Sequence, residues 1–585
     1  MTKTIHHWFQ SGTYRLLAHT SIPERSGRLG VIMMPPFGWE DVSSYRPLRF
    51  LAIQLAENGI PALRYDLPGT GDSSGGAWDD GLVAAWIQSA GDAARELRAI
   101  TGIDRVAVVG TRLGALLAIF AAARARDIGD LVLWGPARSG RAELRELRAF
   151  AKMERWEYAT TPGPSLPDPL HFEVGGFLMS PETLHDLEAL EPAALSSLGG
   201  RRVLILSRDH LRPDSELVRA LASAGCAVAE ENGAGYSAMM TEAHEAHPPE
   251  ATARVIIDFL TGGRQDDRIS LTTHGPRSAG PEPVLDAIVE RADTVESPWG
   301  SIFGVIAEPA RGTPRAECCA LFLNAGGVRH IGPNRMWVEA ARRLAAEGGI
   351  SLRFDLPGIG ESGGDPGLNL PALYQKGLVE QVEFVMESLK SRFGFTRFAV
   401  AGLCSGAFWA FHAALRNVSI SSATLLNPRL FFWGPGVDRR RLIRRGLRAL
   451  IRWEDWYRVA HGGVRLRDLQ RAARTVLAGS RAHGADPAIH GSLPPEMMAG
   501  AWKTIEHRGT RIALVFTEGE PLLREMESEA QLPPLIHSRM RLTRIANAGH
   551  TFRPQWAQRI VLDLIDHELN AALRQSDPDS MAQAI

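Results

Sequence analysis

The sequence predicts an α/β protein with two mostly parallel, doubly wound sheets in tandem, each carrying a helical cap insertion. The chain has 585 residues, and at about 100 to 200 residues per domain this is too long for one hydrophobic core. Short apolar runs alternate with longer amphipathic stretches, as expected of parallel strands joined by helical crossovers. Three sequence blocks also occur twice in the same order, which indicates a duplicated domain rather than a short-period repeat.

The repeated blocks can be compared directly. LRYDLPGTGDSSG from Leu63 matches LRFDLPGIGESGG from Leu352. Further along, VAVVGTRLGALLA matches FAVAGLCSGAFWA, and NGAGY ending at Tyr236 matches ANAGH ending at His550. The offset between corresponding positions grows slowly along the chain rather than scattering, as expected of a duplicated domain.

The first copy illustrates the expected elements. GVIMMP, IPALRYD, RVAVVG, DLVLWG and RRVLILS are apolar or β-branched runs and predict buried strands, whereas LRFLAIQLAENG and WIQSAGDAARELRAITG predict helices between them. We expect one domain over residues 1–262 with a cap at about 136–200, and a second over 284–575 with a cap at about 428–508. The stretch 263–283, which is polar and rich in Gly, Pro and Arg, is the expected linker.

Composition excludes several classes of protein. Hydrophobic residues make up 45% and charged residues 22% of the chain, which is ordinary globular usage rather than that of a disordered or fibrous protein. The 65 basic and 66 acidic side chains nearly cancel, so we expect no general attraction to nucleic acid. The N-terminus lacks the apolar stretch of a signal peptide, and the chain has no apolar run of transmembrane length, so a cytoplasmic protein is expected.

Four cysteines are too few and too irregularly spaced for a disulfide framework or a metal site, and the sequence predicts neither a metal nor a cofactor. Cys226, Cys318 and Cys319 fall in strand-like runs, where a buried thiol is expected. Cys404 differs because it stands at the centre of GLCSG.

GLCSG and the corresponding GTRLG each follow an apolar strand and open an alanine-rich helix. Small residues two positions before and after the centre permit the strained turn of a nucleophile elbow, which exposes the central side chain. Were Ser405 the nucleophile, Leu403 would occupy one of these small positions, so the register favours Cys404.

On these elbows, the repeated LRxDLPGxGxS block and the late GH, the sequence resembles the α/β-hydrolase superfamily, twice and over nearly the whole chain. Within it, the chain is similar to serine aminopeptidase-like hydrolases. One elbow with Arg and one with Cys resembles the paired α/β-hydrolases associated with bacterial exosortase systems. The resemblance implies the chain order nucleophile, acid, histidine.

In the second copy this order implies Cys404 as nucleophile and His550, in NAGHTF, as the base. The acid follows the strand RIALVFTEGE, where Glu520 is favoured over Glu518. The resemblance also implies an oxyanion hole formed by the backbone N–H of Ser405 and, after ALFLNAGG, that of Gly326.

The first copy departs from this pattern. Arg112 stands at the centre of its elbow and Tyr236 at the histidine position, while Asp209 keeps the acid position, so we expect this copy to be non-catalytic. Arg112 has two interpretations, a structural plug neutralised by Glu40 or a captor of anions.

Two further patterns need an interpretation. His244 and His247 in AHEAH lack the HExxH spacing of a metal site and are interpreted as surface histidines. Residues 439–481 hold thirteen arginines against three acids, and their apolar positions recur at helical spacing. This basic cap is either a solvated face paired with acids of the first copy, or a surface for an anionic membrane or for coenzyme A or an acyl carrier protein.

Two functions follow from these observations. The first is a hydrolase or acyltransferase that acts on ester or thioester bonds through Cys404, His550 and Glu520. The alternative is a non-catalytic scaffold or carrier-binding protein in which both copies have lost their chemistry. The second copy's intact histidine and acid positions favour the enzyme.

Overall fold

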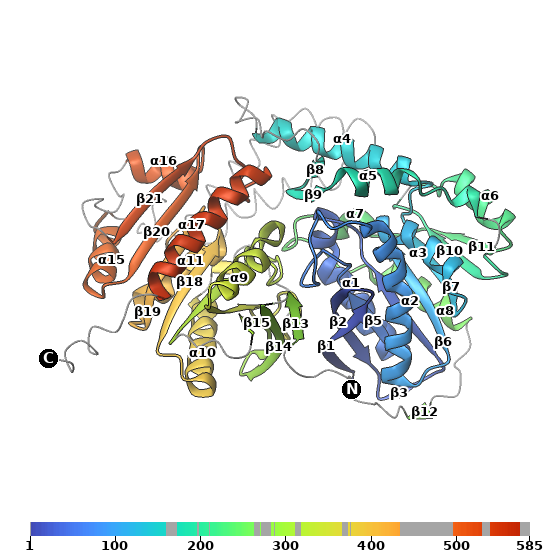
Figure 1. The fold of residues 1–585 in the computed structure, drawn as a ribbon, viewed down its shortest axis with the longest axis horizontal. Helices are drawn as coiled ribbons and strands as arrows, with labels where there is room; N and C mark the ends of the chain where they lie inside the picture. Colours follow the sequence, from blue (N-terminus) through green and yellow to red (C-terminus); the bar gives the residue numbers. More distant parts are fainter. Residues whose placement is uncertain are drawn as a thin grey trace, which may run out of the picture.

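The computed structural model describes residues 2–158, 172–195, 198–209, 211–262, 269–270, 282–285, 287–310, 317–364, 372–374, 376–432, 495–528 and 539–573. They form two α/β units that lie side by side, the first drawn in blue to green and the second in light green through yellow to red (Figure 1). The basic stretch 439–481 and most of the expected linker fall outside these ranges.

The first unit contains an eight-stranded sheet in which β1 and β2 form an antiparallel hairpin and β2 also pairs antiparallel with β5. The other strand pairs are parallel. In spatial order the strands are β1 (Lys3–Ser11), β2 (Tyr14–Ile22), β5 (Ala62–Tyr65), β4 (Leu29–Met34), β6 (Arg105–Thr111), β7 (Ile128–Trp134), β10 (Arg202–Leu206) and β11 (Ala227–Glu231). The five runs expected as strands in this copy are β4, β5, β6, β7 and β10, so this part of the prediction is confirmed.

The second unit repeats this order after one additional edge strand. Its strands are, in spatial order, β13 (Glu282–Leu285), β14 (Ile288–Ser297), β15 (Gly300–Pro309), β17 (Ile350–Phe354), β16 (Cys318–Leu323), β18 (Arg397–Leu403), β19 (Ile420–Leu426), β20 (Arg511–Thr517) and β21 (Met540–Ile545). In both sheets the second strand of the repeated set is antiparallel and the third and fourth exchange places. This is the arrangement of the α/β-hydrolase fold, present twice as expected.

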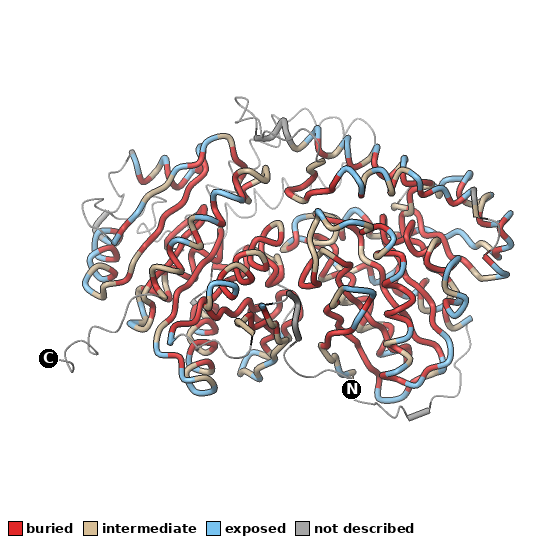
Figure 2. The backbone as a smooth tube through the Cα atoms, viewed as in Figure 1, coloured by how far each residue is buried: buried red, intermediate tan, exposed pale blue. Residues whose placement is uncertain are grey.

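Helices cover both faces of each sheet because their apolar sides match the buried strand faces. In the first unit, α2 (Leu82–Thr101) and α3 (Leu113–Arg124) share one core, and α1 (Trp39–Glu57) and α8 (Glu250–Thr261) share the other. In the second, one core holds α10 (Lys376–Phe393), α11 (Ser405–Arg416), α15 (Pro495–His507) and α16 (Pro521–Ser528), and the other holds α9 (Met336–Ala346) and α17 (Gln555–Leu573). Figure 2 shows the buried chain concentrated in the two sheets and the helices next to them. In the part of the chain that the structure describes, no helix combines the length and apolar character needed to cross a bilayer.

Between β7 and β10 the first unit carries α4 (Gly140–Tyr158), the hairpin of β8 (Phe172–Val174) and β9 (Phe177–Met179), and α5 (Pro181–Glu188). This cap extends from the first unit toward the second in the view of Figure 1. It also touches the second unit, since both Gln555 and Gln558 at the start of α17 donate to the carbonyl of Gly176, at 2.6 and 2.9 Å.

The units meet through their repeated DLPG blocks. The Arg64 guanidinium donates to both carboxylate oxygens of Glu361, at 2.8 and 2.9 Å, and Arg353 donates to Asp72 at 3.0 Å. Arg64 and Arg353 occupy corresponding positions, as do Asp72 and Glu361, so the contact is reciprocal, as in a two-fold symmetric interface. All four side chains are buried.

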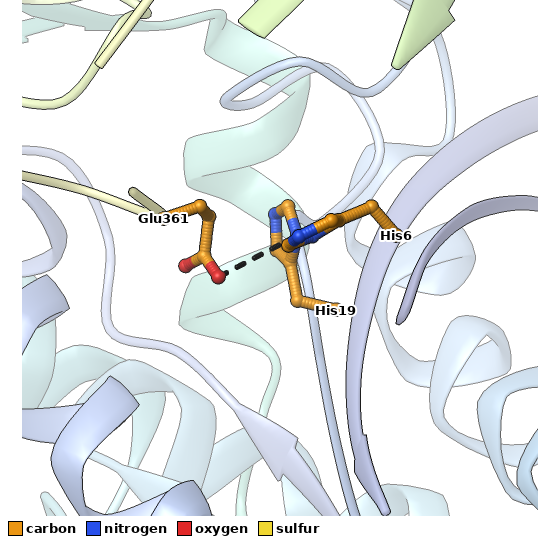
Figure 3. A group of neighbouring side chains, drawn as sticks. All are labelled: His6, His19 and Glu361. Atoms are coloured by element: carbon orange, nitrogen blue, oxygen red, sulfur yellow. Dashed lines mark hydrogen bonds and ion pairs between the residues drawn. The ribbon is translucent and has the colours of Figure 1, made fainter. Parts of the chain in front are cut away.

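A pair of histidines adjoins this interface (Figure 3). His6 and His19 come from β1 and β2, their Nδ1 atoms are 2.7 Å apart, and His19 Nδ1 lies 3.8 Å from Glu361. Burial lowers the pKa of His6 to about 4, so the ring is neutral. A metal ion bound here would have to compete with Arg64 for both oxygens of Glu361, so we assign the cluster to the interface.

Candidate active site

Both copies form the strained turn between strand and helix. Cys404 has φ 59° and ψ −111°, and Arg112 has φ 54° and ψ −120°, a positive φ that is uncommon for residues other than glycine. In the second copy a Cβ at Gly402 would lie 2.2 Å from the carbonyl carbon of Gly406, and one at Gly406 would lie 2.5 Å from the carbonyl oxygen of Asn324. The glycine spacing of the motif is therefore required by close backbone contacts.

The expected base and acid lie together. His550 Nδ1 is 2.7 Å from Glu520 Oε1, and Glu520 is buried at the start of α16, whereas Glu518 is exposed. Asn427, at the end of β19, donates from its side chain to the carbonyl oxygen of His550 at 2.7 Å and so fixes the loop that carries the ring. Of the two candidate acids, the structure brings Glu520 to the histidine.

Cys404 and His550 perturb each other strongly. Burial raises the pKa of the Cys404 thiol, but the charge of His550 and a hydrogen bond to it, with a further contribution from Arg429, outweigh burial and lower the pKa to about 6. Burial lowers the pKa of His550, while Cys404 raises it to about 9. At neutral pH these shifts favour a thiolate beside an imidazolium, the reactive state of a cysteine nucleophile.

Two residues at this site were missed from the sequence. Arg429 Nε donates to His550 Nε2 at 3.3 Å, a contact that requires the neutral imidazole and ends when that nitrogen takes a proton. The Tyr374 hydroxyl lies 3.6 Å from the Cys404 sulfur. Arg429 follows the carboxyl end of β19, where ligand sites of parallel sheets gather, and this position was a usable signal; Tyr374 had none.

The expected oxyanion donors are adjacent, but one of them is occupied. The backbone N–H of Gly326 donates to the Ser405 hydroxyl at 2.9 Å. The neighbouring Asn324 closes the turn, because its side-chain amide donates to the carbonyl of Val328 at 3.1 Å and to Asp355 at 2.9 Å. To bind a substrate oxygen, the Gly326 N–H must exchange its hydroxyl partner for that oxygen.

A segment of the first copy lies on the same turn. A Cβ at Gly327 would be 2.7 Å from the backbone N of His244, and one at Gly326 would be 3.7 Å from His244 Nδ1. The His244 side chain is 18% exposed, so it reaches the surface while it packs on this turn, whereas His247 is exposed. Sequence patterns could not show this, because the contact depends on how the two units pack.

In the first copy Arg112 is a plug. Its guanidinium donates to Glu40 at 2.9 Å, to Glu146 at 2.8 Å and to the carbonyl of Gly135 at 3.1 Å, and lies 3.5 Å from Glu143. The expected pairing with Glu40 is confirmed. Since each nitrogen of the guanidinium already has a protein partner and the side chain is 2% exposed, these contacts disfavour anion capture.

The other two positions of this copy serve the fold. The Asp209 carboxylate accepts from the backbone N–H groups of Gly235, Tyr236 and Ser237, at 2.8, 3.1 and 2.7 Å, and thereby caps the short helix α7 (Tyr236–Met239). The Tyr236 ring is buried against Trp134, with ring centroids 6.3 Å apart. The carboxylate at the acid position thus orients a backbone turn, and an aromatic core residue stands at the position that corresponds to His550.

Several solved structures are similar to the chain. The ferulic acid complex of Est1E from Butyrivibrio proteoclasticus is 17% identical, with 44% of this chain and 98% of that chain covered and a TM-score of 0.32. The proline iminopeptidase of Mycobacterium smegmatis is 14% identical, with 44% of this chain and 98% of that chain covered and a TM-score of 0.31. An esterase of Pyrococcus furiosus is also 14% identical, with 48% of this chain and 90% of that chain covered and a TM-score of 0.32. No family model matches the chain, and no curated protein matches it.

Proposed function

We propose that the second unit is an acyl-transfer enzyme that uses Cys404 as nucleophile on ester or thioester bonds, and that the first unit is non-catalytic. The observation that carries the proposal is the Cys404–His550–Glu520 arrangement. The Cys404 sulfur stands on a strained elbow, and the charge of His550 lowers the pKa of its thiol to about 6 although burial raises it. The His550 imidazole lies 2.7 Å from the buried carboxylate of Glu520.

The reaction has two steps. The Cys404 thiolate attacks the acyl carbon, and the carbonyl electron pair moves to oxygen; when the carbonyl re-forms, the bond to the leaving thiol or alcohol breaks and His550 gives that group its proton. Water, an amine or a hydroxyl then attacks the acyl carbon of the acyl-enzyme while His550 takes the proton of this acceptor, and the bond between the acyl carbon and the Cys404 sulfur breaks, which releases the product and restores the thiolate. Glu520 orients the ring and stabilises its protonated form.

The tetrahedral oxygen would be held by the backbone N–H groups of Ser405 and Gly326, after the Ser405 hydroxyl has turned away from Gly326. A thioester donor suits the nucleophile, because exchange between two thioesters is nearly balanced in energy. Its carrier would be coenzyme A or an acyl carrier protein, attracted by the basic stretch 439–481 that lies outside the described residues.

The test is turnover of a small panel of acyl thioesters and aryl esters by the wild-type chain and by Cys404→Ala and Cys404→Ser. Both variants should lose turnover. Cys226→Ala is the matched control, because this buried thiol lies far along the chain in the first unit, and it should retain full activity. Unchanged turnover by Cys404→Ala would rule out the assignment.

A second candidate function is that of a non-catalytic scaffold, and it is favoured by the occupied Gly326 N–H. Alkylation by iodoacetamide followed by peptide mapping separates the two. Selective labelling of Cys404 that weakens in His550→Ala supports the enzyme. Slow and uniform labelling of all four thiols supports the scaffold.

A further inference from the structure

We propose that the first unit holds the oxyanion loop of the second, residues 324–328, in its working position, so that the two units form one catalytic site. The loop lies between two segments of the first unit, one packed on Gly327 and one bound to the residues that follow the loop. This inference rests on the proposed acyl-transfer function, and it assigns to the non-catalytic unit a positioning role in that reaction.

The first connection is a chain of buried polar side chains. Asn324, which closes the loop, donates to Asp355; the other Asp355 oxygen lies 2.7 Å from His330 Nδ1, and His330 Nε2 lies 2.8 Å from Asp72 of the first unit. Burial lowers the pKa of His330, but Asp72 and Asp355 raise it to about 10, so the ring is a cation that binds both carboxylates. Each of these four side chains is fully buried.

The second connection is made by Arg329, the residue that precedes His330 in the sequence. Arg329, one residue after the loop, donates to both oxygens of Asp66, at 2.8 and 3.1 Å, and to Asp41 at 3.2 Å. Its guanidinium also lies over the Tyr45 ring, 4.0 Å from the centroid. All three partners belong to the first unit, so the loop ends at a side chain that is anchored in the other unit.

The third connection holds a strained stretch of backbone. Asn334 and Arg335 have φ values of 53° and 68°, which persist only where the surroundings fix them. Arg335 donates to the backbone carbonyls of Gly71 and Ser73, at 2.7 and 2.9 Å. The carbonyls of the first unit's own DLPG block therefore stabilise the path that leads from the oxyanion loop into α9.

The opposite side of the loop meets the segment that contains His244. A Cβ at Gly327 would lie 2.7 Å from His244 N and 2.8 Å from the carbonyl carbon of Ala243, so backbone packs on backbone at this point. Oxyanion donors act only when they are held in place before the reaction, and a displacement of about 1 Å can lower the rate about 10²-fold. The position of the Gly326 N–H therefore depends on both units.

Gly327→Ala tests the proposal. Gly327 has no positive φ, so alanine fits its backbone conformation, but the new methyl group must displace the segment at residues 243–244 or the loop itself. We expect kcat for thioester turnover to fall by about 10- to 10³-fold with KM nearly unchanged. The rate of Cys404 alkylation and its pH midpoint should stay at wild-type values, because the thiolate depends on His550 and not on the loop.

Gly500→Ala is the matched control, since a Cβ there meets nothing within 4 Å, and it should behave as wild type. Wild-type kcat in Gly327→Ala, or loss of alkylation together with turnover, would overturn the proposal. Asp72→Asn provides a second variant: if it melts as a folded protein, it should also lose kcat while keeping alkylation, and retained kcat counts against the proposal. Failure of the proposed function itself looks different, because either the wild-type chain would then turn over no substrate or Cys404→Ala would turn it over as fast as wild type.

Discussion

The two elbows of this chain share a backbone and differ in their chemistry. Arg112 and Cys404 have nearly the same φ and ψ and stand between the same kinds of strand and helix. Arg112 is surrounded by carboxylates, whereas Cys404 faces an imidazole and a tyrosine hydroxyl. The strained turn therefore belongs to the fold, and the central side chain and the groups around it set the chemical character of each elbow.

The difference extends to how each site treats charge. In the first unit Arg112 lies within salt-bridge distance of Glu40, Glu143 and Glu146, and Arg208 pairs with Glu146, so its elbow is enclosed by a partly buried cluster of charged side chains. In the second unit the charge pair is Cys404 with His550, and each can give its proton to the other. The carboxylates fix the Arg112 side chain in place, whereas a proton can move between Cys404 and His550.

The largest expected effect comes from His550→Ala. Without the imidazole, turnover should fall by about 10³- to 10⁴-fold, because both proton transfers lose their carrier. The pH midpoint of Cys404 alkylation should rise from about 6 to above neutral, toward the ordinary cysteine pKa of about 8.5. Rates of iodoacetamide labelling between pH 5 and pH 9 measure this shift, and an unchanged midpoint would contradict the ion pair.

Arg112→Ala removes the central side chain of the first elbow and should lower stability. Removal of the guanidinium leaves Glu143 buried and Glu40 and Glu146 next to it without that cation, and we expect a loss of about 3 kcal/mol in the free energy of unfolding. Denaturant unfolding measures the loss. Arg148→Ala, which removes a half-exposed partner of Glu188 on the same cap, is the control and should change stability little. Equal stability of wild type and Arg112→Ala would show that the plug contributes nothing.

Glu520→Gln tests which of the two acidic residues after β20 orients the histidine. The ring of His550 loses the charge that orients it, so turnover should fall by about 10²-fold while the fold is retained. Glu518→Gln, two residues earlier and exposed, should turn over at the wild-type rate. If instead Glu518→Gln is the impaired variant, the acid has been assigned to the wrong residue.

The smallest expected effect is a pH dependence of stability in the first unit. Burial raises the pKa of Glu143, against the attraction of Arg112, from 4.5 to about 7. The folded state therefore binds the proton more tightly between pH 4.5 and pH 7, and the contribution of this group to stability is complete below this window and lost as pH rises through it. The stability of Glu143→Gln relative to wild type should therefore be greater at pH 8 than at pH 5. Melting temperatures of both proteins at these two pH values test the sign, and parallel curves would refute it.

Much of the fold and the site could be predicted because their signals are local. Repeated blocks predicted two sheets, and the glycines around Cys404 predicted the elbow, since close backbone contact requires small residues next to it. The juxtaposition of Glu520 and His550 follows from the resemblance to a known chain order. His244 and Arg329 escaped prediction because their contacts depend on how the two units pack, and Tyr374 because no local pattern places it beside Cys404.

The reciprocal contacts of Arg64 with Glu361 and of Arg353 with Asp72 have the form of contacts between identical subunits. In a dimer encoded by one shorter gene, an arginine at the elbow would appear in both subunits and silence both sites. A single polypeptide removes that restriction, because each copy can change by itself while the ratio of the two stays fixed at one to one. The molecule can thus remain symmetric where its halves touch while its two elbows differ.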